Sequence, residues 1–216
     1  MRSFVSAALR EDWVETTDLA LQFLALTRSH VTVITDLFHA AQQHIEDRWH
    51  NGTAVARDEY RVYRAIENAT AALPDPNPGG VNLSAPGALL ATVWPEEHDL
   101  GCRLVAIALR EAGWNAEVRT QTTREDLAAR LTHQRFALVG ISSTFIGRSR
   151  QEIEGIVADV HQLGIPVIGG GSAFSRSPLL AQQTGVDMFA ADARLAVAHA
   201  ARLSRGGVRR QVREAS

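Results

Sequence analysis

The sequence predicts an α/β protein in which a bundle of about four helices precedes a five-stranded parallel sheet. Residues 5–73 contain a single glycine and repeat their apolar residues at helical spacing. Residues 74–87 hold four of the seven prolines, which is typical of a linker. Between residues 88 and 205, strand and helix patterns alternate in five successive pairs. Such alternation forms a doubly wound sheet with right-handed crossovers.

The first 73 residues carry two apolar faces at helical spacing. One face is predicted to hold Leu19, Phe23, Leu26 and His30, and a second to hold Val33, Leu37, Ala41, His44 and Ile45. The turn residues Asn51, Gly52 and Thr53 are expected to end a helix after Trp49. A further helix is expected to begin near Val55.

In the second half the predicted elements alternate regularly. The expected strands cover 89–94, 116–120, 137–142, 166–168 and 187–190, and the expected helices cover 100–112, 124–133, 150–163, 178–183 and 193–204. The arginine-containing end of the chain, 206–216, is predicted to be a flexible tail. The predicted domains are therefore a helical bundle at 1–73, a linker at 74–87 and a sheet domain at 88–205.

The composition is that of a globular protein, with 45% hydrophobic and 21% charged residues. No apolar stretch reaches the ~20 residues that a membrane-spanning helix needs, and the early acidic residues do not fit a signal peptide. We therefore expect a cytoplasmic protein without a membrane partner. The single cysteine, Cys102, excludes an internal disulfide and a multi-cysteine zinc site. A net charge of −2 gives no general attraction to nucleic acid.

A histidine follows the first predicted strand of the sheet. Pro95 ends the strand 89–94, so His98 lies in the loop at its carboxyl end, where open α/β sheets bind ligands. Glu96 lies two residues before His98 and is close enough to accept a proton from one ring nitrogen. The other nitrogen then presents its lone pair to a metal, since carboxylates commonly orient metal-binding histidines in this way.

Two further features end strands at the same sheet edge. The third strand ends in Gly140-Ile141-Ser142-Ser143-Thr144, which places hydroxyl groups there. The fourth ends in Gly169-Gly170-Gly171-Ser172, where missing side chains allow a bulky or planar group to approach the backbone. The first strand lacks G-x-G-x-x-G, which disfavours a nicotinamide or flavin cofactor.

Together these residues resemble the D/E-x-H-x-x-G … S-x-L … G-G signature of cobalamin-binding Rossmann-like domains over residues 86–204. The resemblance makes His98 the lower cobalt ligand, with Glu96 as its orienting partner and Gly101 completing the first motif. Ser142 and Thr144 would lie beside the displaced nucleotide tail, and Gly170 and Gly171 would leave room for it. Thr144 stands where the family usually has leucine.

The helical half resembles light-sensing cobalamin proteins of the CarH type. Trp49 is followed after nine residues by Glu59-Tyr60, similar to a W-x9-E-H motif that surrounds the upper, adenosyl face of the corrin. His50 occupies the position of the histidine that captures cobalt after light has broken the cobalt–carbon bond. Tyr60 departs from the motif, which has histidine there. The resemblance makes residues 1–73 a helical cap over adenosylcobalamin.

These observations predict a cobalamin-dependent photoreceptor that is not an enzyme and that signals through a change in conformation or oligomeric state. No winged-helix segment precedes the bundle, so we expect self-association or a separate downstream protein as the output, without direct binding of nucleic acid. Stand-alone modules of this resemblance, called photocobilins, hold a bilin beside the cobalamin. Biliverdin is therefore a candidate second chromophore.

Two alternatives share the His98 motif. The first is a corrinoid methyl carrier of a methyltransferase system, which must open its upper face to a partner enzyme. A lid built from Trp49 and His50 would obstruct that exchange. The second alternative is a cobalamin-responsive antirepressor, which differs from the photoreceptor only in its partner.

Overall fold

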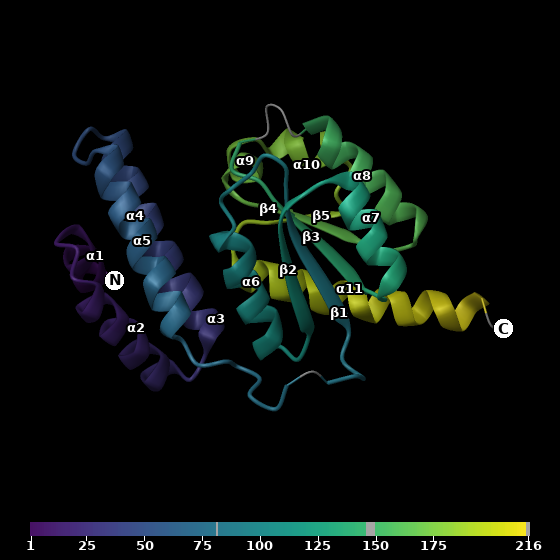
Figure 1. Ribbon diagram of the computed structural model, residues 1–216, viewed down its shortest axis with the longest axis horizontal. Helices are drawn as coiled ribbons and strands as arrows, with labels where there is room; N and C mark the ends of the chain where they lie inside the picture. The colour runs from purple at the N-terminus through teal and green to yellow at the C-terminus, as the bar shows by residue number, and fades with distance from the viewer. Residues whose placement is uncertain (81, 146–149, 215–216) are drawn as a thin grey trace. The chain divides into compact units, whose positions relative to one another are not determined.

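The protein consists of two compact units, residues 1–76 and 77–216 (Figure 1). The computed structural model describes residues 1–80, 82–145 and 150–214, without the side chains of residues 178 and 204–214. The boundary between the units falls within the predicted linker, 74–87. Within the described residues, no helix is both long and apolar enough to cross a membrane.

The first unit is helical, as predicted. Its elements are α1 (Arg2–Leu9), α2 (Trp13–Thr27), α3 (His30–Thr32), a π-helical segment η1 (Val33–His39), α4 (Ala40–His50) and α5 (Ala56–Ala72). The α3, η1 and α4 segments follow one another without a break, so the unit has four helical rods. Its core contains Phe4, Phe38, Ile45 and Ile66, and the rings of Phe4 and Phe38 lie 5.7 Å apart.

One predicted face of this unit is wrong. Leu26 and His30 were expected to share a helical face, but α2 ends at Thr27 because Arg28 adopts a left-handed conformation with φ of 54°. The hydroxyl of Ser29 then accepts a hydrogen bond from the backbone of Thr32 and caps a new helix. Leu26 is consequently 83% exposed, whereas His30 is buried.

The second unit is a parallel sheet covered by helices on both faces (Figure 1). The strands β1 (Gly87–Val93), β2 (Asn115–Thr122), β3 (Leu138–Ser142), β4 (Val167–Gly170) and β5 (Met188–Ala190) lie in the order β2-β1-β3-β4-β5. The helices are α6 (Leu100–Glu111), α7 (Arg124–His133), α8 (Arg150–Gln162), α9 (Ser172–Arg176), α10 (Pro178–Thr184) and α11 (Ala193–Glu214). This arrangement confirms the predicted Rossmann-like fold.

The strands β1, β3 and β4 are buried on both faces, which explains their continuous apolar sequences. One core layer joins Leu90 to Cys102 and Ala106 of α6 and to Ala196 of α11. The other joins Leu89, Val139 and Ile141 to residues of α7, α8 and α9. Consecutive residues of β1 thus pack into opposite layers.

Two features of this unit differ from prediction. Residues 172–176 form the short helix α9 directly after the glycine cluster, where no helix was predicted. The last helix, α11, continues to Glu214 and so extends beyond the predicted helix 193–204. Arginine, glutamine and glutamate are good helix formers, and their propensity exceeds the local cost of Gly206 and Gly207.

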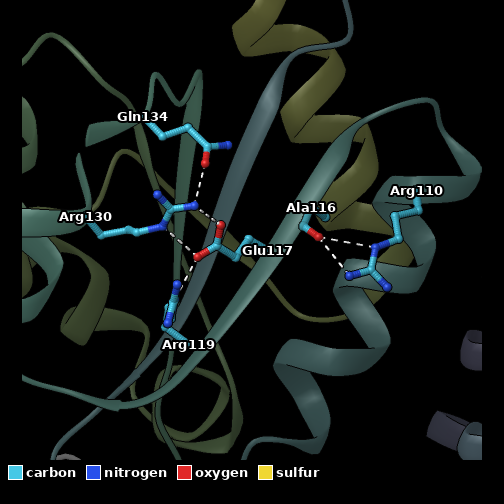
Figure 2. A network of polar contacts seen from close by, with 6 residues as sticks. All are labelled: Arg110, Ala116, Glu117, Arg119, Arg130 and Gln134. Atoms are coloured by element: carbon cyan, nitrogen blue, oxygen red, sulfur yellow. Dashed lines mark hydrogen bonds and ion pairs between the residues drawn. The ribbon is translucent and has the colours of Figure 1, made fainter. Parts of the chain in front are cut away.

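Charged side chains lie along β2, which is an edge strand of the sheet (Figure 2). Glu117 accepts hydrogen bonds from Arg130 at 2.5 and 2.8 Å and from Arg119 at 2.7 Å. These bonds, first of all that from Arg130, lower the pKa of Glu117. The guanidinium group of Arg110, on α6, donates to the carbonyl oxygen of Ala116, on β2, at 2.8 and 3.2 Å.

Candidate cofactor site

The loop that carries His98 is folded tightly against the end of β1. After Val93 the chain passes through a cis peptide bond between Trp94 and Pro95, and the backbone nitrogen of Glu96 donates to the carbonyl of Val93 at 2.9 Å. The buried hydroxyl of Thr92 donates to the carbonyl of Glu96 at 3.2 Å and accepts from the backbone of Gln121 at 2.9 Å. The end of β1 therefore fixes the position of Glu96.

Glu96 and His98 form the close pair that the sequence predicts. The Oε1 atom of Glu96 lies 2.6 Å from Nδ1 of His98 and accepts a further hydrogen bond from the His98 backbone at 3.0 Å. The Glu96 side chain is only 4% exposed, whereas that of His98 is 53% exposed. The carboxylate is thus inside the fold, and the imidazole is at the surface of the sheet edge.

The second oxygen of Glu96 holds the loop that follows β3. Its Oε2 atom accepts a hydrogen bond from the backbone of Thr144 at 2.7 Å and a longer one from Phe145 at 3.4 Å. Burial raises the pKa of Glu96, but the hydrogen bonds from Thr144 and His98 outweigh it, and the pKa lies below its ordinary value. Glu96 is therefore a carboxylate at neutral pH.

This geometry fixes the tautomer that a metal ligand needs. A carboxylate can only accept a hydrogen bond, so the proton of the imidazole lies on Nδ1. In the neutral ring the lone pair is then on Nε2, the nitrogen that would coordinate cobalt. Outer carboxylates of this kind typically contribute about 10–100-fold to metal affinity.

Small residues surround the site at the ends of β3 and β4. A Cβ atom at Gly101 would lie 3.5 Å from the hydroxyl of Ser142, and one at Gly170 would lie 3.5 Å from the carbonyl of Ala190. These are ordinary contact distances. Gly171, at φ of 90°, is different, because a Cβ atom there would lie 2.4 Å from the carbonyl of Ser143. The fold itself therefore requires Gly171, whereas Gly170 could carry a Cβ atom without a clash.

Cys102 is a buried core residue beside this site. Burial raises the pKa of its thiol to about 12, and Ser142 is its hydrogen-bonding neighbour. The thiol is therefore protonated and shielded from reagents. Cys102 is thus a small residue of the sheet unit's core.

Two exposed aromatic residues lie in the loops at this end of the sheet and were not predicted from the sequence. Trp94, in the loop after β1, is 59% exposed, and Phe145, in the loop after β3, is 66% exposed. The ring of Phe145 lies 6.0 Å from that of His98, at an interplanar angle of 65°. Both residues follow strands at the ligand-binding end of the sheet, and this position in the sequence could have identified them as candidate site residues. They give the site an apolar surface suited to a large ring.

The helical unit holds the other predicted residues at the junction of α4 and α5. The rings of Trp49 and His50 lie 5.3 Å apart at the end of α4, and both side chains are exposed. The Nδ1 atom of His50 donates to the carbonyl of Glu46 at 2.8 Å. Glu59 and Tyr60 lie near the start of α5, and Tyr60 is exposed.

The predicted residues thus form two groups, one in each unit. The sheet unit brings Glu96, His98, Gly101, Ser142 and Thr144 to one edge, together with the glycines after β4. The donor set there fits a cobalt cofactor, since the carboxylate orients one imidazole and the flanking groups are small or apolar. Trp49 and His50 form the second group at the end of α4.

Known structures share this fold. The monomethylamine corrinoid protein of Methanosarcina barkeri superposes with a TM-score of 0.73 at 17% identity, over 91% of this chain and 94% of that chain. A cobalamin-binding protein from Desulfitobacterium hafniense DCB-2 superposes with a TM-score of 0.51 at 17% identity, over 93% of this chain and 96% of that one. No curated protein sequence matches the chain.

The model of the B12 binding domain family matches residues 86–201, which is more than half of the chain and includes His98, Ser142 and the glycines after β4. The matched segment is the sheet unit from the start of β1 into α11. The chain therefore belongs to the B12 binding domain family, and it binds cobalamin.

Proposed function

We propose that this protein is a cobalamin-dependent photoreceptor in which His98 binds cobalt from below and His50 binds it from above after illumination. It acts as a sensor and not as an enzyme. The native cofactor is adenosylcobalamin. The output is a change in conformation or in self-association, read by a separate downstream protein.

The observation that carries the proposal is that His98 and His50 have the same tautomer, with the proton on Nδ1. In each, Nδ1 donates to an oxygen that can only accept, namely the Glu96 carboxylate for His98 and the Glu46 carbonyl for His50. Each neutral ring therefore has its lone pair on Nε2. His50 also stands beside the exposed ring of Trp49. A carrier that exchanges methyl groups with a partner enzyme has no evident use for this second imidazole.

The residues then have simple roles. Glu96 holds the His98 ring, and Ser142 and Gly170 receive the displaced nucleotide tail beside the sheet. Trp49 covers the upper ligand and excludes water and substrates, and Glu59 and Tyr60 lie on the next helix. Adenosylcobalamin, when bound, supplies a cobalt–carbon bond that light breaks. His50 is the residue that would hold the cobalt through Nε2 once the adenosyl group has left, and a pull on the end of α4 would be the primary signal.

Absorption spectroscopy of the His50→Ala variant tests this proposal. The chain is loaded with adenosylcobalamin in the dark, and spectra are recorded before and after green light. We expect the wild type to reach a stable spectrum with two histidine ligands, and His50→Ala to bind equally in the dark but to lack that product. His133→Ala is the matched control, because its Nδ1 makes the same type of bond, to Ala129 at 2.7 Å. An unchanged photoproduct in His50→Ala would contradict the role of His50.

The same experiment separates the alternatives. A parallel sample with biliverdin tests for the second chromophore, and a far-red band is the expected sign of binding. The methyl carrier is the second candidate, and it is favoured by the similarity to the monomethylamine corrinoid protein. Cobalamin binding without a specific photoproduct would support the carrier. Co-purification with a transcription factor from native cells would support the antirepressor.

A further inference from the structure

Phe145 is an exposed aromatic residue whose ring contacts a candidate metal ligand. It lies directly after Thr144 in the loop that leaves β3, and 66% of its surface is exposed. Its ring meets the imidazole of His98 at 6.0 Å and 65°, an edge-type arrangement. Such pairs are favourable beyond the area that they bury. An exposed phenylalanine in this contact indicates an apolar surface that a ligand covers.

The backbone of Phe145 is hydrogen-bonded to Glu96, the same carboxylate that holds the imidazole of His98. Oε2 of Glu96 accepts from Thr144 at 2.7 Å and from Phe145 at 3.4 Å, while Oε1 holds Nδ1 of His98 at 2.6 Å. One buried carboxylate therefore sets both the position of the imidazole and the start of the Phe145 loop. The two rings meet in a defined geometry because both are held by Glu96.

We propose that Phe145 is a positioning residue for His98. The contact between the two rings limits the orientation of the imidazole. Glu96 holds the imidazole at Nδ1, and Phe145 contacts the ring itself. This contact limits movement of the imidazole about its Cβ–Cγ bond. This inference rests on the proposed ligation of cobalt by His98 and adds the residue that limits the ligand's orientation.

The test uses Phe145→Ala and Phe145→Leu in the full chain. Leucine keeps apolar cover but removes the aromatic edge. Leu163→Ala is the matched control. Leu163 is an exposed apolar residue in the loop between α8 and β4, so it lies at the amino ends of the strands, whereas His98 lies at their carboxyl ends. Three quantities are measured: the chemical shifts of the His98 ring in the cofactor-free protein, the dissociation constant for cobalamin, and the nitrogen splitting in the electron paramagnetic resonance spectrum of the cob(II)alamin-loaded protein.

We expect both Phe145 variants to shift and broaden the His98 ring signals. We also expect them to weaken cobalamin binding about three- to tenfold, the range for one aromatic pair, and to reduce the fraction of cobalt that shows imidazole splitting. The unfolding temperature should stay the same because Phe145 is exposed. Leu163→Ala should resemble the wild type in all three measurements.

Wild-type behaviour of Phe145→Ala, or of Phe145→Leu, in affinity and splitting overturns the inference. An equal loss in Leu163→Ala overturns it as well, since the effect would then be general. Failure of the proposed ligation is recognised separately with His98→Ala. If that variant keeps both the affinity and the nitrogen splitting, His98 is not the ligand, whatever Phe145 does to the ring signals of the cofactor-free protein.

Discussion

Glu96 joins two loops through one carboxylate. Its oxygens accept hydrogen bonds from the ring and backbone of His98 and from the backbones of Thr144 and Phe145. The sequence allowed the contact with His98 to be predicted, because two residues of spacing bring the groups together. It could not reveal the bonds to Thr144 and Phe145, which lie 48 and 49 residues away and depend on the pairing of β1 with β3.

Glu96→Gln should lower both stability and cobalamin affinity. The amide of glutamine has one accepting oxygen instead of two, so it cannot accept from both Thr144 and His98, and an unmet buried donor costs about 1–3 kcal/mol. The pKa of Glu96 in the fold lies below its ordinary value of 4.5, so the carboxylate stabilises the fold above pH 4.5. That contribution is lost as the pH falls through the folded-state pKa.

Urea unfolding at pH 7 and pH 4 measures this effect in the cofactor-free chain. The difference in unfolding free energy between wild type and Glu96→Gln should be larger at pH 7. The exposed neighbour Glu97 provides the control, and Glu97→Gln should change little at either pH. A difference that stays constant with pH would exclude the titration of Glu96 as its cause.

At the scale of elements, the strands and helices of the sheet unit were largely predictable. The helix α7 occupies the predicted residues, and the five strands lie within a few residues of expectation, because buried parallel strands and amphipathic helices alternate clearly. The helical unit was less predictable. Its π-helical segment η1 and the left-handed Arg28 depend on local backbone geometry that apolar spacing does not encode.

Gly170 and Gly171, at the end of β4, have different roles, and their alanine variants should distinguish a role in folding from a role in cofactor binding. Gly171→Ala should lower the unfolding free energy by about 2–3 kcal/mol, because φ of 90° and the Ser143 carbonyl at 2.4 Å both exclude a side chain. Gly170→Ala should leave the cofactor-free fold nearly unchanged and weaken cobalamin binding. Thermal unfolding and cofactor titration measure the two effects. Equal destabilisation by both variants would refute the assignment.

At the scale of the whole molecule, the chain consists of two units that each bury their own core. The predicted linker, 74–87, presents Leu83, which is 94% exposed. Exposed chain of this kind is a preferred site of proteolysis. The sequence indicated this linker through its prolines.

The two parts of the chain on either side of Leu83, residues 1–83 and 84–216, should each fold when expressed separately and mixed. We expect cobalamin to remain with the larger fragment on gel filtration, because it contains Glu96, His98 and Gly170. Absorbance of the eluted peaks at the cofactor wavelengths provides the measurement. Cobalamin that elutes with residues 1–83 would contradict the assignment of the primary site.

The bond from Arg110 to β2 affects how this edge of the sheet can associate with other molecules. An edge strand is a template on which an extended strand of another molecule can add, and this is how many proteins begin to form fibrils. Arg110 already occupies the carbonyl of Ala116 on β2, and the charges of Glu117 and Arg119 follow along the same strand. These side chains therefore hinder the addition of a further strand to β2. Loss of Arg110 would first be noticed as insoluble protein, with the chemistry at His98 intact.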